Sequence, residues 1–162
     1  ANRKLMMQNI VGAFTDLYKG NFPELEFVNI AHNYARWENH YNTNVIVHRK
    51  GATSAREGET GIIPGSQGTQ SYIVRGKGNS ESFESCSHGA GRVLGRKQAE
   101  RTLDLQAEIA RMNEKGIIHA IRSKSDLDEA PGAYKNIGEV MENQNDLVEI
   151  MVELHPLAVI KG

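Results

Sequence analysis

Ser85-Cys86-Ser87-His88-Gly89-Ala90-Gly91-Arg92 lies in the middle of a 162-residue chain and decides how that chain is interpreted. A histidine followed closely by two glycines leaves backbone amides that no side chain shields, and such amides bind phosphate oxygens. We expect a helix to begin just after Gly91, which would add partial positive charge there. On that helix Arg92 and Arg96 would lie one turn apart and point at one anion. The pattern predicts a phosphate cradle edged by His88; the alternative is a glycine-rich turn with a surface histidine and two solvated arginines.

Positive charge and glycine are both concentrated around this stretch. The net charge is only -1, yet residues 48–97 hold eight basic and four acidic side chains and ten of the 16 glycines. A basic, glycine-rich segment of this kind indicates an anion site rather than a general nucleic-acid-binding surface. The acidic region 98–162 would be the only support for a protein–protein interaction domain.

The remaining composition favours a single cytoplasmic domain. The length fits one unit over residues 1–162. One cysteine, Cys86, excludes an internal disulfide and a cysteine-cluster zinc site, and is typical of a reducing compartment. No stretch approaches the roughly 20 apolar residues that span a bilayer. The first residues lack the apolar run of a signal peptide, so we expect no export.

Hydrophobic spacing predicts helices and short strands in irregular alternation. Because there is no βαβ rhythm, the expected fold class is α+β. We expect helices at 3–18, 31–41, from 92 past 97, at 104–115 and from Pro131 onward, and strands at 44–48, 60–63, 71–74, 117–121, 147–154 and 157–160.

Three further stretches carry candidate chemistry, each with a plainer alternative. In Ile63–Tyr72, glycines bracket a serine whose hydroxyl and neighbouring amides suit phosphate or ribose oxygens, although a hairpin turn also explains them. His32-Asn33 would suit a metal ligand with a neighbouring amide, or a structural histidine. His48-Arg49-Lys50 is either an anion contact or a solvated charge cluster.

Taken in order, these strings resemble the RtcB-type RNA ligase family, and in particular the C-terminal portion of its longer members. Any one string is weak, but the ordered set covers almost the whole chain. The matching strings are Ala31-His32-Asn33-Tyr34, His48-Arg49-Lys50-Gly51-Ala52-Thr53, Ile63-Pro64-Gly65-Ser66, Ser85 to Arg92, Glu129-Ala130-Pro131-Gly132-Ala133-Tyr134-Lys135 and Lys161-Gly162.

The resemblance implies a GTP- and Mn²⁺-dependent ligase of tRNA splicing or RNA repair. Such enzymes join an RNA 3′-phosphate or 2′,3′-cyclic phosphate to a 5′-hydroxyl through a guanylylated histidine, which His88 matches. His32 matches one Mn²⁺ ligand. Arg92, Arg96, Arg49 and Lys50 would contact RNA or its phosphate. The residues expected around the guanylate are His32, Asn33, Pro64, Gly65, Ser66, Gln67, Ser71, His88, Gly89, Ala90, Gly91, Tyr134 and Lys161.

Departures from the family pattern limit what this chain would do alone. Gln67 stands where methionine is usual and Gly95 where serine is usual, and both changes look tolerable. The other metal ligands of the family, including a cysteine that Cys86 does not match, belong to the N-terminal half. We therefore expect this chain to need that half for guanylylation. The partners would be RNA, that half and an activating protein; the alternative is a non-catalytic fragment that binds guanine nucleotide or RNA ends.

Overall fold

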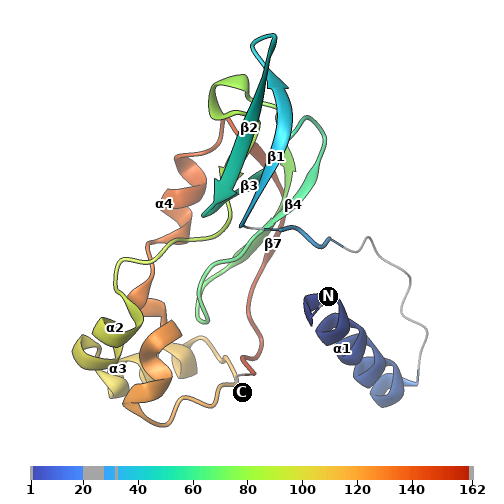
Figure 1. Ribbon diagram of the computed structural model, residues 1–162. Coiled ribbons are helices and arrows are strands. Elements are labelled where there is room, and N and C mark those ends of the chain that lie inside the picture. The colour runs from blue at the N-terminus through green and yellow to red at the C-terminus, as the bar shows by residue number, and fades with distance from the viewer. Residues whose placement is uncertain (1, 20–27, 32, 161–162) are drawn as a thin grey trace.

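The computed structural model describes residues 2–19, 28–31 and 33–160, and it has the expected α+β architecture. Helices and short strands are interspersed along the chain (Figure 1). The elements are α1 (Asn2–Tyr18), β1 (Asn33–His40), β2 (Thr43–Lys50), β3 (Ala52–Ser54), β4 (Thr60–Ile63), β5 (Ser71–Gly76), η1 (Ser80–Ser82), β6 (Ser85–Ser87), α2 (Arg96–Thr102), α3 (Leu105–Glu114), η2 (Lys124–Glu129), η3 (Pro131–Ala133), α4 (Ile137–Glu142) and β7 (Val148–Leu154).

Within the described residues, the strands form three small antiparallel sheets. β1 and β2 make a long hairpin that projects from the top of the molecule in Figure 1. β3 pairs with β6 so that Thr53 lies opposite Cys86. β5 is the central strand of the third sheet, between β4 and β7. The hairpin and the β3–β6 pair therefore bring residues 33–54 alongside the strand that leads to His88.

Two apolar clusters hold these elements together. The first lies between the three-stranded sheet and α4, and its members are Ile63, Tyr72, Val74, Cys86, Ala90, Ile137, Met141 and Val148, together with Ala55. The second supports the helical lower part of Figure 1, and its buried members are Met112, Ile117, Ile121, Leu127 and Ala130. The segment after β6 contributes Ala90 to the first cluster, so His88 stands at the edge of a packed region.

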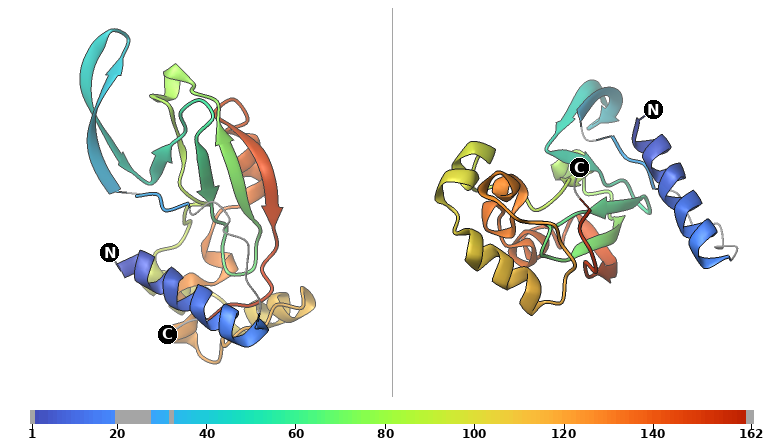
Figure 2. Two further views of the ribbon diagram at one scale, coloured as in Figure 1. Left: turned by 90° about the vertical axis from the view of Figure 1, so that its right-hand side faces the viewer. Right: turned by 90° about the horizontal axis from the view of Figure 1, so that it is seen from below.

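Helix α1 confirms the expected helix over 3–18, but its large apolar side chains are exposed rather than packed in a core. It lies apart from the sheets in Figures 1 and 2, with Phe14 50% and Leu17 74% exposed. Among the described residues, no helix combines the length and the apolar character needed to cross a membrane.

Four expectations about secondary structure are wrong. Residues 33–40 form strand β1 rather than part of a helix over 31–41. The buried residues of this strand are Glu38 and His40, two positions apart, as alternation in a strand requires. The expected strands at 117–121 and 157–160 reduce to one isolated parallel bridge between Ile118 and Ala158.

The helix expected directly after Gly91 begins only at Arg96. Gly91 has a φ of +74°, a left-handed conformation that favours glycine. The next residue, Arg92, then forms an extended bridge with Tyr134. Pro131 likewise opens a short 3₁₀ turn, and α4 follows from Ile137.

Candidate nucleotide site

His88 stands directly after β6, at the wall of an open cleft. Pairing of Ser87 with Ala52 fixes the end of that strand. The imidazole is half-buried with its Nδ1 atom inside the protein, and it lines a cleft of about 670 Å³. Gly51 and Lys135 line the same cleft. The His88 ring therefore borders an open cleft, with its Nδ1 atom on the protein side.

The loop from Pro64 to Gln70 lies against the glycines that follow His88. The Ala90 amide donates to the carbonyl of Pro64 at 3.0 Å, and a Cβ added at Gly89 would lie 3.1 Å from that same oxygen. The two strings that were predicted to bind the nucleotide are thus joined by a direct backbone hydrogen bond, and a side chain at Gly89 would crowd the Pro64 carbonyl.

The same loop is also the connection of a β-hairpin, as its plainer interpretation predicts. Ile63 pairs with Tyr72, so β4 and β5 flank it directly. Within it the Ser66 amide donates to Thr69 Oγ1 at 2.7 Å. A Cβ at Gly65 would lie 2.1 Å from the carbonyl oxygen of Gln70. The loop is therefore closed on itself and has a fixed shape.

The expected cradle of unshielded amides is not what forms next to His88. The Ala90 amide is bound to Pro64, and the Gly89 amide donates to Ser87 Oγ at 3.3 Å. The following helix begins only at Arg96, so it does not start at the glycines beside the imidazole. Attraction for an anion must then come from side chains around the cleft, of which Lys135 is one.

Arg92 and Arg96 do converge, but on a carboxylate of the protein. Each lies 3.0 Å from Glu129, Arg92 through Nη1 and Arg96 through Nε. Arg92 also stacks over the ring of Tyr134, 4.9 Å from its centroid, and donates to its hydroxyl at 3.1 Å. Burial, with a hydrogen bond to Glu129, raises the pKa of Tyr134. Arg96 is 72% exposed in its side chain and could turn to an incoming phosphate.

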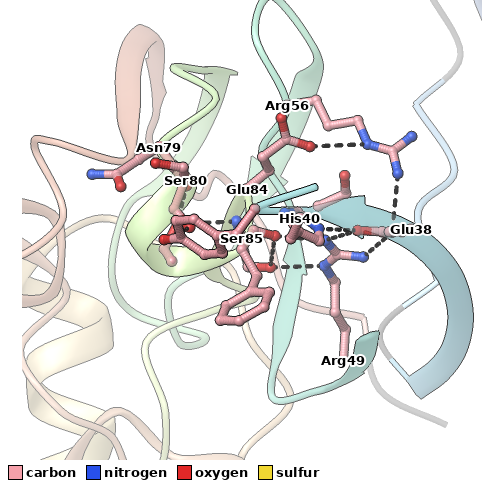
Figure 3. A network of polar contacts seen from close by, with 12 residues as sticks. Glu38, His40, Arg49, Arg56, Asn79, Ser80, Glu84 and Ser85 are labelled. Carbon is pink, nitrogen blue, oxygen red and sulfur yellow. Dashed lines mark hydrogen bonds and ion pairs between the residues drawn. The ribbon is translucent and has the colours of Figure 1, made fainter. Parts of the chain in front are cut away.

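Arg49 is not available as a phosphate contact. Its side chain is 1% exposed and forms a bidentate ion pair with Glu38, at 2.6 and 2.9 Å (Figure 3). The neighbouring Lys50 is exposed and lies opposite Asn33 in the β1–β2 register. Of the basic cluster at this strand end, the structure leaves Lys50 at the surface and places Arg49 inside.

Helix α4 contributes cleft residues that the sequence analysis did not select. Glu139 of the helix and Asn143, the residue that follows its last turn, both lie on the cleft. Gln144 is buried, and its Oε1 accepts from the Ser87 amide at 2.9 Å. The polar i, i+4 spacing opposite the apolar Ile137 and Met141 was the available signal, but it also describes any solvated helix face.

Comparison with known proteins decides the family. The family model described as "tRNA-splicing ligase RtcB" matches residues 1–162. This chain belongs to the RtcB family. The RNA-splicing ligase RtcB of Escherichia coli is 42% identical over 166 residues, which cover 99% of this chain and 40% of the relative. The tRNA-splicing ligase RtcB of Nanoarchaeum equitans is 37% identical over 187 residues, covering 100% and 39%. The chain spans about 40% of the length of these curated relatives.

The described part of this RtcB chain does not assemble a metal site. Within residues 2–19, 28–31 and 33–160, no three His, Cys, Asp or Glu side chains come together as ligands would. His32 and Lys161, predicted to bind metal and guanine, lie outside the described residues. Asn33 Oδ1 contacts His48 Nε2 at 3.2 Å. Burial raises the pKa of the Cys86 thiol to about 11.

Proposed function

We propose that this chain is the nucleophile-bearing, guanylate-binding part of an RtcB-type RNA ligase, forming one unit over residues 1–162. The proposal is carried by one observation: His88 lines a cleft and is followed by glycines that contact the Pro64 loop. Both segments match family strings of the nucleotide site. The names of the curated relatives, RNA-splicing and tRNA-splicing ligases, support the same reaction class.

In the proposed reaction, a neutral His88 imidazole nitrogen attacks the α-phosphorus of GTP. A nitrogen–phosphorus bond forms while the bond to the pyrophosphate oxygen breaks, and pyrophosphate leaves. The GMP then passes to the RNA 3′-phosphate, which frees the imidazole. Attack by the 5′-hydroxyl on the activated phosphate seals the strand and releases GMP. Neutral imidazole suits the first step because it is a good nucleophile near neutral pH.

Other side chains have supporting roles in this proposal. Pro64, Gly65, Ser66, Gln67 and Ser71 would hold the guanylate, with Asn33, Tyr134 and Lys161 completing the pocket. Arg96 and Lys50, exposed at the surface, are the cations proposed to meet RNA phosphates. Mn²⁺ would need His32 together with ligands from the rest of an RtcB-type ligase, because the described residues form no such group.

The proposal therefore makes the chain dependent on a second portion, which we expect to be the N-terminal half of an RtcB-type ligase. With one buried cysteine to keep reduced, the cytoplasm is the proposed setting. An activating protein partner is part of the same proposal. Such a partner would promote repeated guanylylation of His88.

The test is incubation of the chain with labelled GTP and Mn²⁺, with and without the N-terminal half of an RtcB-type ligase. We expect a covalent GMP adduct only when both portions are present. Binding of GMP without an adduct in the complete assembly would instead identify a non-catalytic binding fragment, and absence of both binding and adduct would refute the proposal.

A further inference from the structure

We propose that Arg49, held by Glu38, is a positioning residue for His88: it fixes the chain segment that leads into the strand before the nucleophile. This inference rests on the proposed function, because it concerns the rate at which His88 takes up GMP. It replaces the RNA contact that the sequence suggested for Arg49 with a role inside the protein.

The guanidinium of Arg49 uses its donors on two separate segments. Nη1 and Nη2 bind the two oxygens of Glu38 at 2.6 and 2.9 Å. Nε donates to Ser85 Oγ at 2.8 Å, and Nη2 also donates to the carbonyl of Phe83 at 2.9 Å. Figure 3 shows Arg49 of β2 in contact with Glu38 of β1 and with Ser85, the first residue of β6. A planar guanidinium can satisfy this arrangement, whereas a lysine ammonium cannot.

The segment that Arg49 holds has an unusual backbone. Phe83 and Glu84 have φ values of 53° and 50°, two consecutive residues in the left-handed region. Such residues cost free energy, and they persist only where their surroundings hold them in place. Arg49 binds on both sides of this turn, at the Phe83 carbonyl and at Ser85, the first residue of β6. His88 follows Ser85 by three residues, so the conformation of this turn determines where the His88 imidazole lies.

Glu38 is anchored as firmly as the arginine it binds. Its side chain is 3% exposed, and His40 and Arg56 each approach it to 3.0 Å. Arg56 in turn reaches Glu84, at 3.5 Å. The ion pair therefore holds Arg49 inside the β1–β2 hairpin, and the hydrogen bonds of Arg49 to Phe83 and Ser85 tie the hairpin to the turn before β6. The same hairpin begins at Asn33.

Burial also explains why an RNA role for Arg49 is disfavoured. To reach a phosphate, the guanidinium would have to give up both oxygens of the buried Glu38 carboxylate and its contacts at Phe83 and Ser85. A surface arginine such as Arg96 can make such a contact without that loss. A contribution from Arg49 should therefore appear before any RNA binds.

The experiment measures single-turnover guanylylation of the full-length ligase, meaning this sequence together with the N-terminal half of an RtcB-type ligase. The variants are Arg49→Lys, Glu38→Gln and the milder Ser85→Ala, which removes one acceptor. Arg75→Lys is the matched control, because its exposed side chain only approaches Glu149 at 3.9 Å. At each GTP concentration, the rate constant and the fraction of protein modified are recorded separately.

The inference predicts that Arg49→Lys and Glu38→Gln slow the rate constant at saturating GTP by roughly 10- to 100-fold. Ser85→Ala should slow it by a smaller factor, and Arg75→Lys should leave it unchanged. The modified fraction and the GTP concentration for half-maximal rate should stay the same, because the variants, although less stable, remain folded in the assay and bind the nucleotide as before.

Three results would overturn the inference. A lower modified fraction with an unchanged rate constant would show that the pair only supports folding. Normal guanylylation with slow sealing of RNA ends would restore Arg49 as an RNA contact. Rates equal to wild type in Ser85→Ala, Arg49→Lys and Glu38→Gln would remove the positioning role. If the wild-type ligase forms no GMP adduct, the proposed function fails and this inference fails with it. The wild-type sample alone reveals that outcome.

Discussion

The buried Glu38–Arg49 ion pair should make the free energy of unfolding fall at acid pH. The single substitution Glu38→Gln should remove this part of the pH dependence. The hydrogen bonds that Arg49 donates lower the pKa of Glu38 from 4.5 to about 2, with burial opposing the change. At about 1.4 kcal/mol per pKa unit, the ionised carboxylate then contributes about 3 kcal/mol to the free energy of unfolding. Because the folded pKa is the lower one, this contribution is complete above pH 4.5 and is lost as the pH falls toward 2.

The perturbation is Glu38→Gln, and the assay is urea unfolding from about pH 7 down to pH 3. Near neutral pH the variant should be less stable by roughly 3–5 kcal/mol, because Arg49 stays buried without a counter-ion. Between about pH 5 and pH 3 the wild type should lose about 2 kcal/mol more than the variant, so the two curves approach each other.

The control for this experiment is Glu149→Gln, which removes an exposed carboxylate 3.9 Å from Arg75. It should lie within about 1 kcal/mol of wild type and follow the wild-type acid dependence. Parallel curves for wild type and Glu38→Gln, separated by the same amount at every pH, would refute the reasoning about the Glu38 pKa.

Three further predictions concern the packing around the site. Gly65→Ala should lower the free energy of unfolding by about 1–3 kcal/mol in urea titrations, because its Cβ would lie 2.1 Å from the Gln70 carbonyl oxygen. Gly95→Ala, where nothing lies within 4 Å, is the control, and an equal loss in both would contradict this account. Burial raises the pKa of the Cys86 thiol to about 11, so the thiol should resist iodoacetamide near pH 8 in the folded chain and react in urea. Mass spectrometry would detect the modification. Equal rates of modification in the folded and the urea-unfolded chain would show that the thiol is accessible. Leu127→Ala, at a fully buried position, should cost about 2–5 kcal/mol, and a loss below 1 kcal/mol would mean that the second cluster is not a core.

The sequence was sufficient for the fold class and for most elements with apolar periodicity. The strands at 60–63 and 71–74 form the β4–β5 hairpin, and the helix over 104–115 matches α3. These elements bury aliphatic side chains such as Ile63 and Val74, whose spacing is visible in the sequence. Apolar periodicity therefore located the elements of the main core.

Strand β1 could not be found in that way, because its buried residues are charged or polar. Glu38 and His40 point inward only because Arg49, eleven residues after Glu38, reaches back to neutralise the carboxylate. A charged core carries no apolar signal, and the same hidden contact made Arg49 look like a surface cation. Motif order identified the family and the segments that meet around His88.

The arrangement of Arg92 depended on a conformation that residue types alone do not specify. Either a helix or a turn could follow Gly91, and its φ of +74° selects the turn. The two arginines still converge, but through Glu129 rather than through a shared helix face. The sequence predicted that Arg92 and Arg96 converge, but it did not predict that Glu129 lies between them.

The central claim, that His88 is the residue that carries the nucleotide, is tested most directly by locating the adduct. The ligase assembled from this chain and the N-terminal half would be incubated with GTP and Mn²⁺, digested and mapped by mass spectrometry. The account predicts one acid-labile GMP group, on the peptide that contains His88, and none in His88→Ala. A GMP group on any other residue, or an unchanged adduct in His88→Ala, would contradict it.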